Sequence, residues 1–79
     1  MKVRVHIALK SGVLDPQGKA IGTALKSLGF SGVEEVRQGK FIDLDLTETD
    51  PARAKATAED MCKRLLANTV METYAVEVV

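Results

Sequence analysis

The chain has 79 residues, with 11 Lys or Arg and 11 Asp or Glu, so its formal net charge is zero. This length allows one domain, and folding buries only about 60% of the surface of so short a chain. The charge balance argues against a dedicated nucleic-acid binder, and no apolar run approaches the roughly 20 residues of a membrane span. A lone cysteine and the absence of a signal-peptide pattern predict a cytoplasmic protein, with a single domain over residues 1–79.

The first half of the chain predicts a strand, a helix and a second strand. Residues 2–10 alternate apolar and polar side chains, as a half-buried strand does. Asp15 is the expected N-cap of a helix with Pro16 at its first position, and Gly29 is the expected stop. The apolar face of this helix comprises Ala20, Ile21, Ala24, Leu25 and Leu28. Residues 33–38 predict a short strand, with a tight turn at Gln38-Gly39.

The second half of the chain predicts the same order of elements: a strand, a helix and a strand. Residues 41–46 predict a strand whose apolar side chains face the core, namely Ile42, Leu44 and Leu46. Asp50-Pro51 begins the second helix, and its apolar face comprises Ala54, Ala58, Met61, Cys62, Leu65 and Leu66. Residues 73–79 predict the last strand, at a sheet edge that only Glu77 protects from pairing with another chain.

The element order is therefore β-α-β-β-α-β. It predicts an α+β fold, a two-layer sandwich in which an antiparallel four-stranded sheet carries both helices on one face, the ferredoxin-like plan. The opposite face of the sheet is mostly polar. The apolar edge of the last strand predicts self-association or docking to a larger subunit.

The side chains that usually perform catalysis or bind metals form no known pattern. His6 is the only histidine and lies mid-strand on the polar face, where a surface role is expected rather than that of a base. Cys62 lies on an apolar helix face, which keeps a thiol protonated. Asp43 and Asp45 share the solvent face of a strand and lack the glycine-containing spacing of a calcium loop. We therefore predict no catalytic residue, no metal ligand and no cofactor-binding residue.

Several segments together resemble one family. They are LKSGVLDPQGKAI (residues 9–21), LGF (28–30), VRQGKFIDLDL (36–46) and MCKRLLANTVMETY (61–74). At this spacing, in so short a chain, they are similar to PurS, the small subunit of phosphoribosylformylglycinamidine synthase. Thr69 stands where the family pattern has proline, and Met71 where a branched residue is commoner.

The resemblance implies a structural subunit in purine biosynthesis that bridges a PurQ glutaminase and a PurL synthetase and supports ammonia transfer between them. It implies a homodimer, or a higher oligomer, within a complex that uses ATP, Mg and glutamine, none of them bound by this chain. The loop and hairpin expected to be presented to partners supply the candidate interface residues Gly12, Val13, Leu14, Asp15, Gln17, Gly18, Arg37 and Lys40. A plain helix cap and β-turn would use the same residues.

Two other classes of function remain open at this point. A ligand-binding regulatory domain of the ACT kind has the same βαββαβ order, and it predicts saturable binding of an amino acid or a nucleotide. A stand-alone enzyme predicts turnover by the isolated chain.

Overall fold

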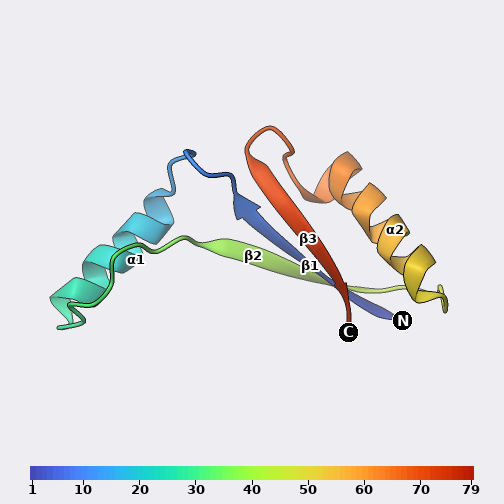
Figure 1. Cartoon of the computed structure of the whole chain (residues 1–79), viewed down its shortest axis with the longest axis horizontal. Coiled ribbons are helices and arrows are strands. Elements are labelled where there is room, and N and C mark those ends of the chain that lie inside the picture. The colour runs from blue at the N-terminus through green and yellow to red at the C-terminus, as the bar shows by residue number, and fades with distance from the viewer.

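The computed structural model describes every residue from Met1 to Val79. It contains three strands and two helices (Figure 1), in the order β1 (Lys2–Leu9), α1 (Pro16–Ser27), β2 (Gly39–Asp45), α2 (Pro51–Met61) and β3 (Glu72–Val78). One turn of π-helix, η1 (Cys62–Leu66), continues α2.

The sheet is antiparallel, with strand order β2-β1-β3. Val5 of the central strand lies opposite Ile42 on β2 and Val76 on β3. One face of β1 packs against α2 and the residues that follow α2. Together they make the core of Val3, Val5, Ile7, Ala54, Ala58, Cys62 and Ala67. The alternation of β1 and the small residues of α2 thus produce the packing that the sequence predicts, because alanines allow the helix to approach the sheet closely.

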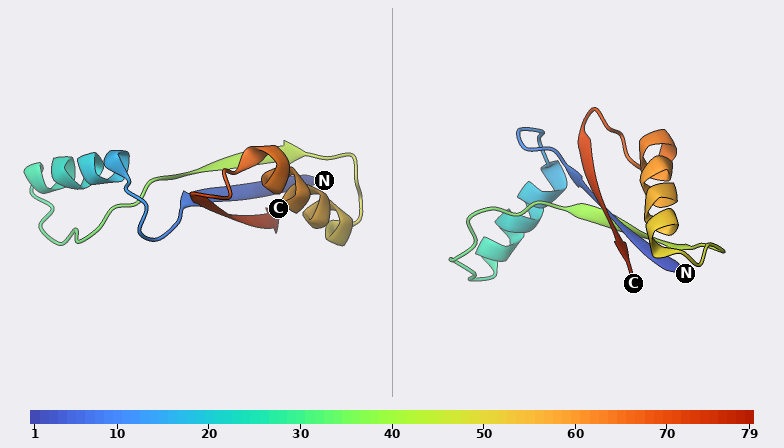
Figure 2. Two further views of the ribbon diagram at one scale, coloured as in Figure 1. Left: turned by 90° about the horizontal axis from the view of Figure 1, so that it is seen from above. Right: turned by 45° about the vertical axis from the view of Figure 1, so that its right-hand side comes forward.

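The helix α1 lies away from the sheet. Figures 1 and 2 show it projecting beyond the end of β1, with residues 31–38 returning beside it. It has no packed interface with any strand, whereas α2 packs against β1 and β3. The radius of gyration is 15.8 Å, against about 12 Å for a compact chain of this length. We call α1 together with residues 28–38 the arm.

The prediction of a four-stranded sheet with both helices on one face is wrong, because the sheet has three strands and only α2 covers it. Residues 33–38 form no strand and enter β2 without a hairpin turn at Gln38-Gly39. The physical reason lies in the bonds of this segment. The backbone N–H of Gln38 donates to the Asp15 carboxylate at 2.6 Å, and Val36 packs over Gly22 of α1. The segment therefore belongs to the arm rather than to a hairpin.

The ends of α1 follow the sequence prediction. Asp15 accepts a hydrogen bond from the N–H of Gly18 at 2.9 Å, and Pro16 occupies the first turn. At the other end Gly29 has φ of +100°. The N–H of Phe30 donates to the carbonyl of Leu25, and that of Gly29 to the carbonyl of Lys26, which is the Schellman arrangement.

The second helix also begins as predicted, because Asp50 accepts a hydrogen bond from the N–H of Ala52 at 3.0 Å. Its end differs from the prediction. The N–H of Ala67 donates to the carbonyl of Cys62, a bond that spans one residue more than in an α-helix. This π turn rotates Leu65 out of the apolar face assigned to it, and the residue is 83% exposed.

Candidate subunit interface

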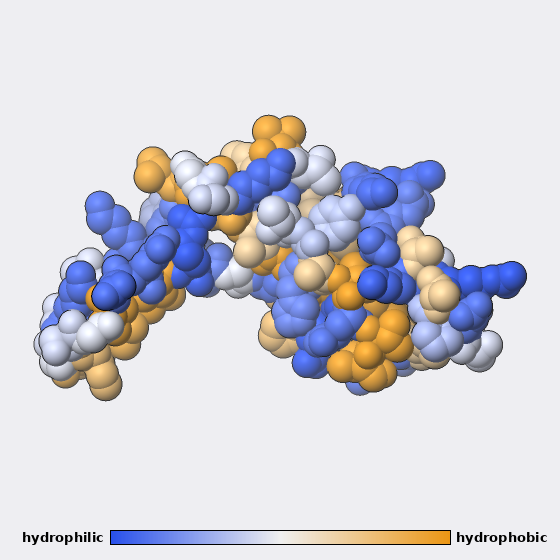
Figure 3. All heavy atoms as spheres, viewed as in Figure 1, coloured by the Kyte–Doolittle hydropathy of each residue, from blue (hydrophilic) through white to orange (hydrophobic).

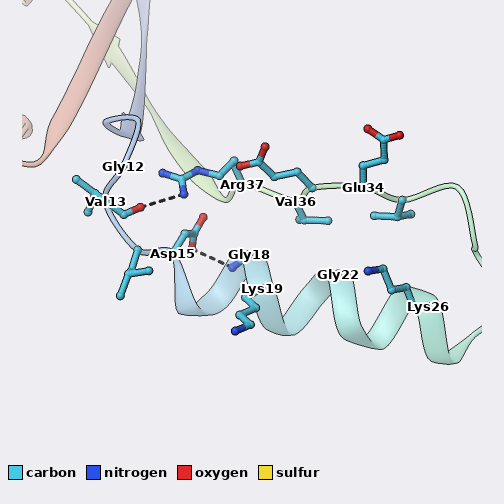
Figure 4. Close-up of a pocket in the computed structure, with 13 residues that line it drawn as sticks. Gly12, Val13, Asp15, Gly18, Lys19, Gly22, Lys26, Glu34, Val36 and Arg37 are labelled. Atoms are coloured by element: carbon cyan, nitrogen blue, oxygen red, sulfur yellow. Dashed lines mark hydrogen bonds between the residues drawn. The ribbon is translucent and has the colours of Figure 1, made fainter.

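Two loops that are far apart in the sequence are tied together where the arm leaves the sheet (Figure 4). Arg37 donates from Nη1 to the carbonyl of Val13 at 3.0 Å and from Nη2 to the carbonyl of Lys10 at 3.2 Å. Asp15 accepts from the N–H groups of Gly18 and Gln38, one at each carboxylate oxygen. One acidic and one basic side chain therefore connect residues 10–18 to residues 37–38.

These bonds favour the charged form of the Asp15 side chain. The hydrogen bond from the backbone of Gly18, followed by that from Gln38, lowers the pKa of this carboxyl below its ordinary value. The nearby Arg37 guanidinium acts in the same direction. The connection between the loops is thus complete at neutral pH.

The arm packs closely because α1 carries glycines where residues 33–37 pass over it. A side-chain carbon at Gly18 would collide with the carbonyl oxygen of Val36 and lie 2.6 Å from Oδ2 of Asp15. At Gly22 the same carbon would lie 3.4 Å from Cγ2 of Val36. Between the helix and this segment runs a groove of about 430 Å³.

The structure brings all the sequence-predicted interface residues to this junction, but it gives them two different roles. Val13, Asp15, Gly18 and Arg37 are used inside the junction, as acceptors, donors or packing surface. Four others lie exposed around it, namely Gly12, Leu14, Gln17 and Lys40. Leu14 is 87% exposed, so a large apolar side chain is presented to solvent beside a rigid turn. That these residues contact a partner stays a prediction.

Polar side chains on the open face of the sheet pair with one another. Arg4 bonds both carboxylate oxygens of Asp43, at 2.8 and 3.2 Å, and its guanidinium lies 4.9 Å from the centre of the Phe41 ring. His6 lies 3.3 Å from Glu77. The hydrogen bond from Arg4 lowers the pKa of Asp43. The Arg4–Asp43 ion pair is exposed to water, which makes it weak.

Groups capable of other chemistry are dispersed. No three His, Cys, Asp or Glu side chains converge as a metal site would require. Burial raises the pKa of the Cys62 thiol, with a smaller contribution from Glu59, which agrees with the structural role predicted from its apolar setting. No helix of the chain has the length and apolar character that crossing a bilayer requires.

Sequence reasoning did not identify two exposed residues at the far end of α2. The apolar spacing places Leu65 on the face of α2 that packs on the core, and it does not reveal the π turn. Val70 is 80% exposed in the turn before β3. The available signal for it was its position two residues after Asn68, in the turn that follows the helix.

Solved structures similar to this one include subunits of one enzyme complex. The PurS of Methanocaldococcus jannaschii, described as one of the subunits of formylglycinamide ribonucleotide amidotransferase, is 45% identical with a TM-score of 0.87, and the match covers 96% of this chain and 92% of that one. A chain of PurLQS from Thermotoga maritima is 29% identical with a TM-score of 0.89, over 99% of this chain and 95% of that one. The fold thus defines a subunit of a multi-component synthase.

The sequence comparisons give the family. A family model described as PurS, phosphoribosylformylglycinamidine (FGAM) synthase, matches residues 2–79. The PurS subunit of Bacillus subtilis is 44% identical over 77 residues, which is 98% of this chain and 90% of that protein. The PurS subunit of a Synechocystis species is 45% identical over 75 residues, 95% of this chain and 75% of that protein. The chain belongs to the PurS family, whose member in the synthase is not the catalytic subunit.

Proposed function

We propose that the chain is the small assembly subunit of FGAM synthase in purine biosynthesis, and that it joins a PurQ glutaminase subunit to a PurL synthetase subunit. The observation that carries this proposal is the match of 99% of the chain to a subunit of PurLQS. In this proposal PurL and PurQ bind the ATP, Mg²⁺ and glutamine that the reaction uses, and the complex lies in the cytoplasm.

The assembly begins with a second copy of the chain, because one copy leaves two apolar surfaces uncovered. The first is the face of α1, where Ile21 is 40% and Leu28 is 74% exposed. In Figure 3 hydrophobic atoms follow one edge of the arm. The second is the inner face of β2, where Ile42 and Leu44 are half-buried while α2 packs over the other two strands. Apolar surface of this extent favours association.

A single chain cannot bring these two surfaces together. Residues 36–39 continue straight from the arm into β2, so the apolar face of α1 is carried away from its own sheet (Figure 2). Two copies can exchange arms, so that α1 of each lies over β2 of the other, beside α2. Each sheet then carries two helices on one face, one from each copy. The exchange is symmetric and closes after two copies.

Such a dimer provides a rigid body with separate surfaces for the two other subunits. Holding the glutaminase and the synthetase on one body raises the effective concentration of each at the other. Ammonia released at the first site then reaches the second with less loss to water.

Reconstitution tests this function. Purified PurL and PurQ are assayed for FGAM synthesis from glutamine with and without the chain, and ammonia replaces glutamine as a control. We expect the chain to be required with glutamine and dispensable with ammonia. Equal glutamine-dependent rates without the chain would show that it does not join the two subunits.

A further inference from the structure

One side of β2 has no neighbouring strand, because the sheet order is β2-β1-β3. Leu46, directly after β2, exchanges two hydrogen bonds with Met1. Its N–H donates to the Met1 carbonyl at 2.8 Å, and its carbonyl accepts from the Met1 amino group at 2.7 Å. Bonded residues alternate along an antiparallel pair, so the even-numbered residues of β2 bond β1. The backbone N–H and C=O groups of Gly39 and Phe41 therefore point away from the sheet.

The same alternation continues into the segment that leads to β2. The N–H of Gln38 donates to the Asp15 carboxylate, and the carbonyl oxygen of Val36 lies against Gly18 of α1. Both groups face the chain's own arm and junction, which leaves the N–H and C=O of Arg37 on the other side. No backbone group of residues 31–37 makes a backbone hydrogen bond within the chain. We call the outward-pointing backbone groups of Arg37, Gly39 and Phe41 the free edge.

A free edge of this kind accepts another strand, because its unpaired N–H and C=O groups can continue the hydrogen-bond ladder. Residues 36–42 contain no proline that would prevent it. An identical strand fits in antiparallel orientation about a two-fold axis beside Gly39, which has no side chain to obstruct the approach. Arg37 of each copy then lies opposite Phe41 of the other, and their N–H and C=O groups exchange hydrogen bonds.

Side chains on the inner face support this pairing. Val36 lies opposite Ile42 of the other copy, and both residues are half-buried in the single chain. Apolar side chains opposite each other on one face of a sheet stabilise it. Because Val36 packs over Gly22 of its own α1 (Figure 4), the same pairing carries α1 over Ile42 of the other copy.

A second copy of the chain is therefore the occupant that fits the free edge. A strand from an unrelated protein could form the same backbone bonds. It would leave the apolar face of α1 uncovered, where Leu28 is 74% exposed. One two-fold axis covers this face and pairs both free edges, and the contact closes after two copies.

We propose that the two copies of the dimer pair residues 36–42 with one another as antiparallel strands, so that a single continuous sheet crosses the dimer. The inference rests on the dimer of the proposed function and locates its axis beside Gly39. Each free edge supplies donors and acceptors for the backbone groups that have no partner in the other chain.

Amide hydrogen exchange measured by NMR tests the pairing in the unmodified chain, while sedimentation verifies that the sample is dimeric. The amides of Tyr74 and Val76 are internal controls. The N–H of Val79 donates to the carbonyl of Lys2 at 3.0 Å, so the odd-numbered residues of β3 bond β1 and these two amides lie at the outer edge. We expect the amides of the free edge to exchange about a hundredfold or more slowly than the two controls, after correction for sequence effects.

A matched pair of variants tests the same contact through the dimer's dissociation constant. Phe41→Pro and Phe41→Ala both remove the aromatic ring, but only proline also removes the N–H. In a single chain that N–H points outward, where an edge strand tolerates proline. We expect Phe41→Pro to raise the dissociation constant about tenfold or more above that of Phe41→Ala, because the two-fold axis removes the bond twice.

The exchange measurement decides the outcome even if the proline variant does not fold. Free-edge amides that exchange as fast as Tyr74 and Val76 in a dimeric sample would overturn the proposal. Protection of the two controls instead would place the contact at β3 and overturn it as well. A slow free edge in a chain that PurL and PurQ do not require would refute the proposed function and leave the pairing intact. A chain that stays monomeric would remove both the dimer and this inference.

Discussion

The side chain of Asp15 and the backbone of Gln38 are joined by a hydrogen bond of 2.6 Å, although 23 positions separate them in the sequence. The same carboxylate caps α1 through Gly18. One residue therefore sets both the start of the helix and the direction in which the segment after it returns to the sheet. The arm keeps its orientation because these two bonds share a single side chain.

Replacing Asp15 tests this double role. Asp15→Ala removes the cap and the bond to Gln38, and we expect the thermal midpoint to fall by a few degrees. Asp15→Asn keeps a capping oxygen for Gly18 but places an amide donor against the N–H of Gln38. We therefore expect its thermal midpoint to lie between those of the unmodified chain and of Asp15→Ala. Differential scanning calorimetry measures both midpoints. If Asp15→Asn matches the unmodified chain, the bond to Gln38 contributes nothing.

The stability of the chain depends on pH through Asp15 and Asp43. Folding lowers the pKa of both carboxyls, so each contributes stability above its unfolded pKa of about 3.9. That contribution is lost as pH falls through the lower, folded value. We expect urea midpoints to be level near neutrality and to decline below about pH 4. In the variant with Asn at both positions, we expect the urea midpoint to fall less steeply below about pH 4. An equally steep fall would show that these two carboxyls do not cause the pH dependence.

The two glycines of α1 respond differently to alanine. Alanine is the better helix residue by about 1 kcal/mol, but at Gly18 its side chain collides with the backbone of Val36. We expect Gly18→Ala to destabilise by about 1–3 kcal/mol. Gly22→Ala meets only the side chain of Val36, at ordinary van der Waals distances of 3.4 and 3.8 Å, and is neutral or stabilising. Urea denaturation of the two variants measures the difference, which disappears if the arm does not pack as described.

The exchange of arms depends on the apolar face of α1. Leu28→Asp places a charge on the surface that would cover β2 of the other copy. We expect it to raise the dissociation constant of the dimer tenfold or more, which corresponds to about 1.4 kcal/mol or more of lost binding free energy. Thr23→Asp is the matched control, because Thr23 is exposed and outside the apolar face. Analytical ultracentrifugation over a dilution series measures the constants. Equal constants for the two variants would place the dimer contact elsewhere.

Cys62 reports on the core between α2 and the sheet. It is fully buried and its pKa is raised by burial, so thiolate is scarce at neutral pH. We expect a thiol reagent to modify the folded chain many times more slowly than the chain in denaturant. A rate in buffer equal to that in denaturant would show that the helix does not stay packed over Cys62.

The sequence by itself predicts most of the elements and the family. Asp15 with Pro16 and Asp50 with Pro51 act over neighbouring residues, so local spacing identifies both helix starts. The alternation of β1 identifies its buried side for the same reason. The motifs around GVLDPQG and LLAN indicate PurS before any fold is known, and the comparisons confirm it.

Only the tertiary structure decided where the arm lies and which side chains remain outside. Whether residues 33–38 turn back as a strand depends on Gln38 meeting Asp15 and Val36 meeting Gly22, contacts across many positions that a local pattern cannot reveal. The outward rotation of Leu65 depends on one bond from Ala67 to Cys62. Periodicity shows which face of an element is apolar. What covers that face depends on how distant segments, or separate copies, pack together.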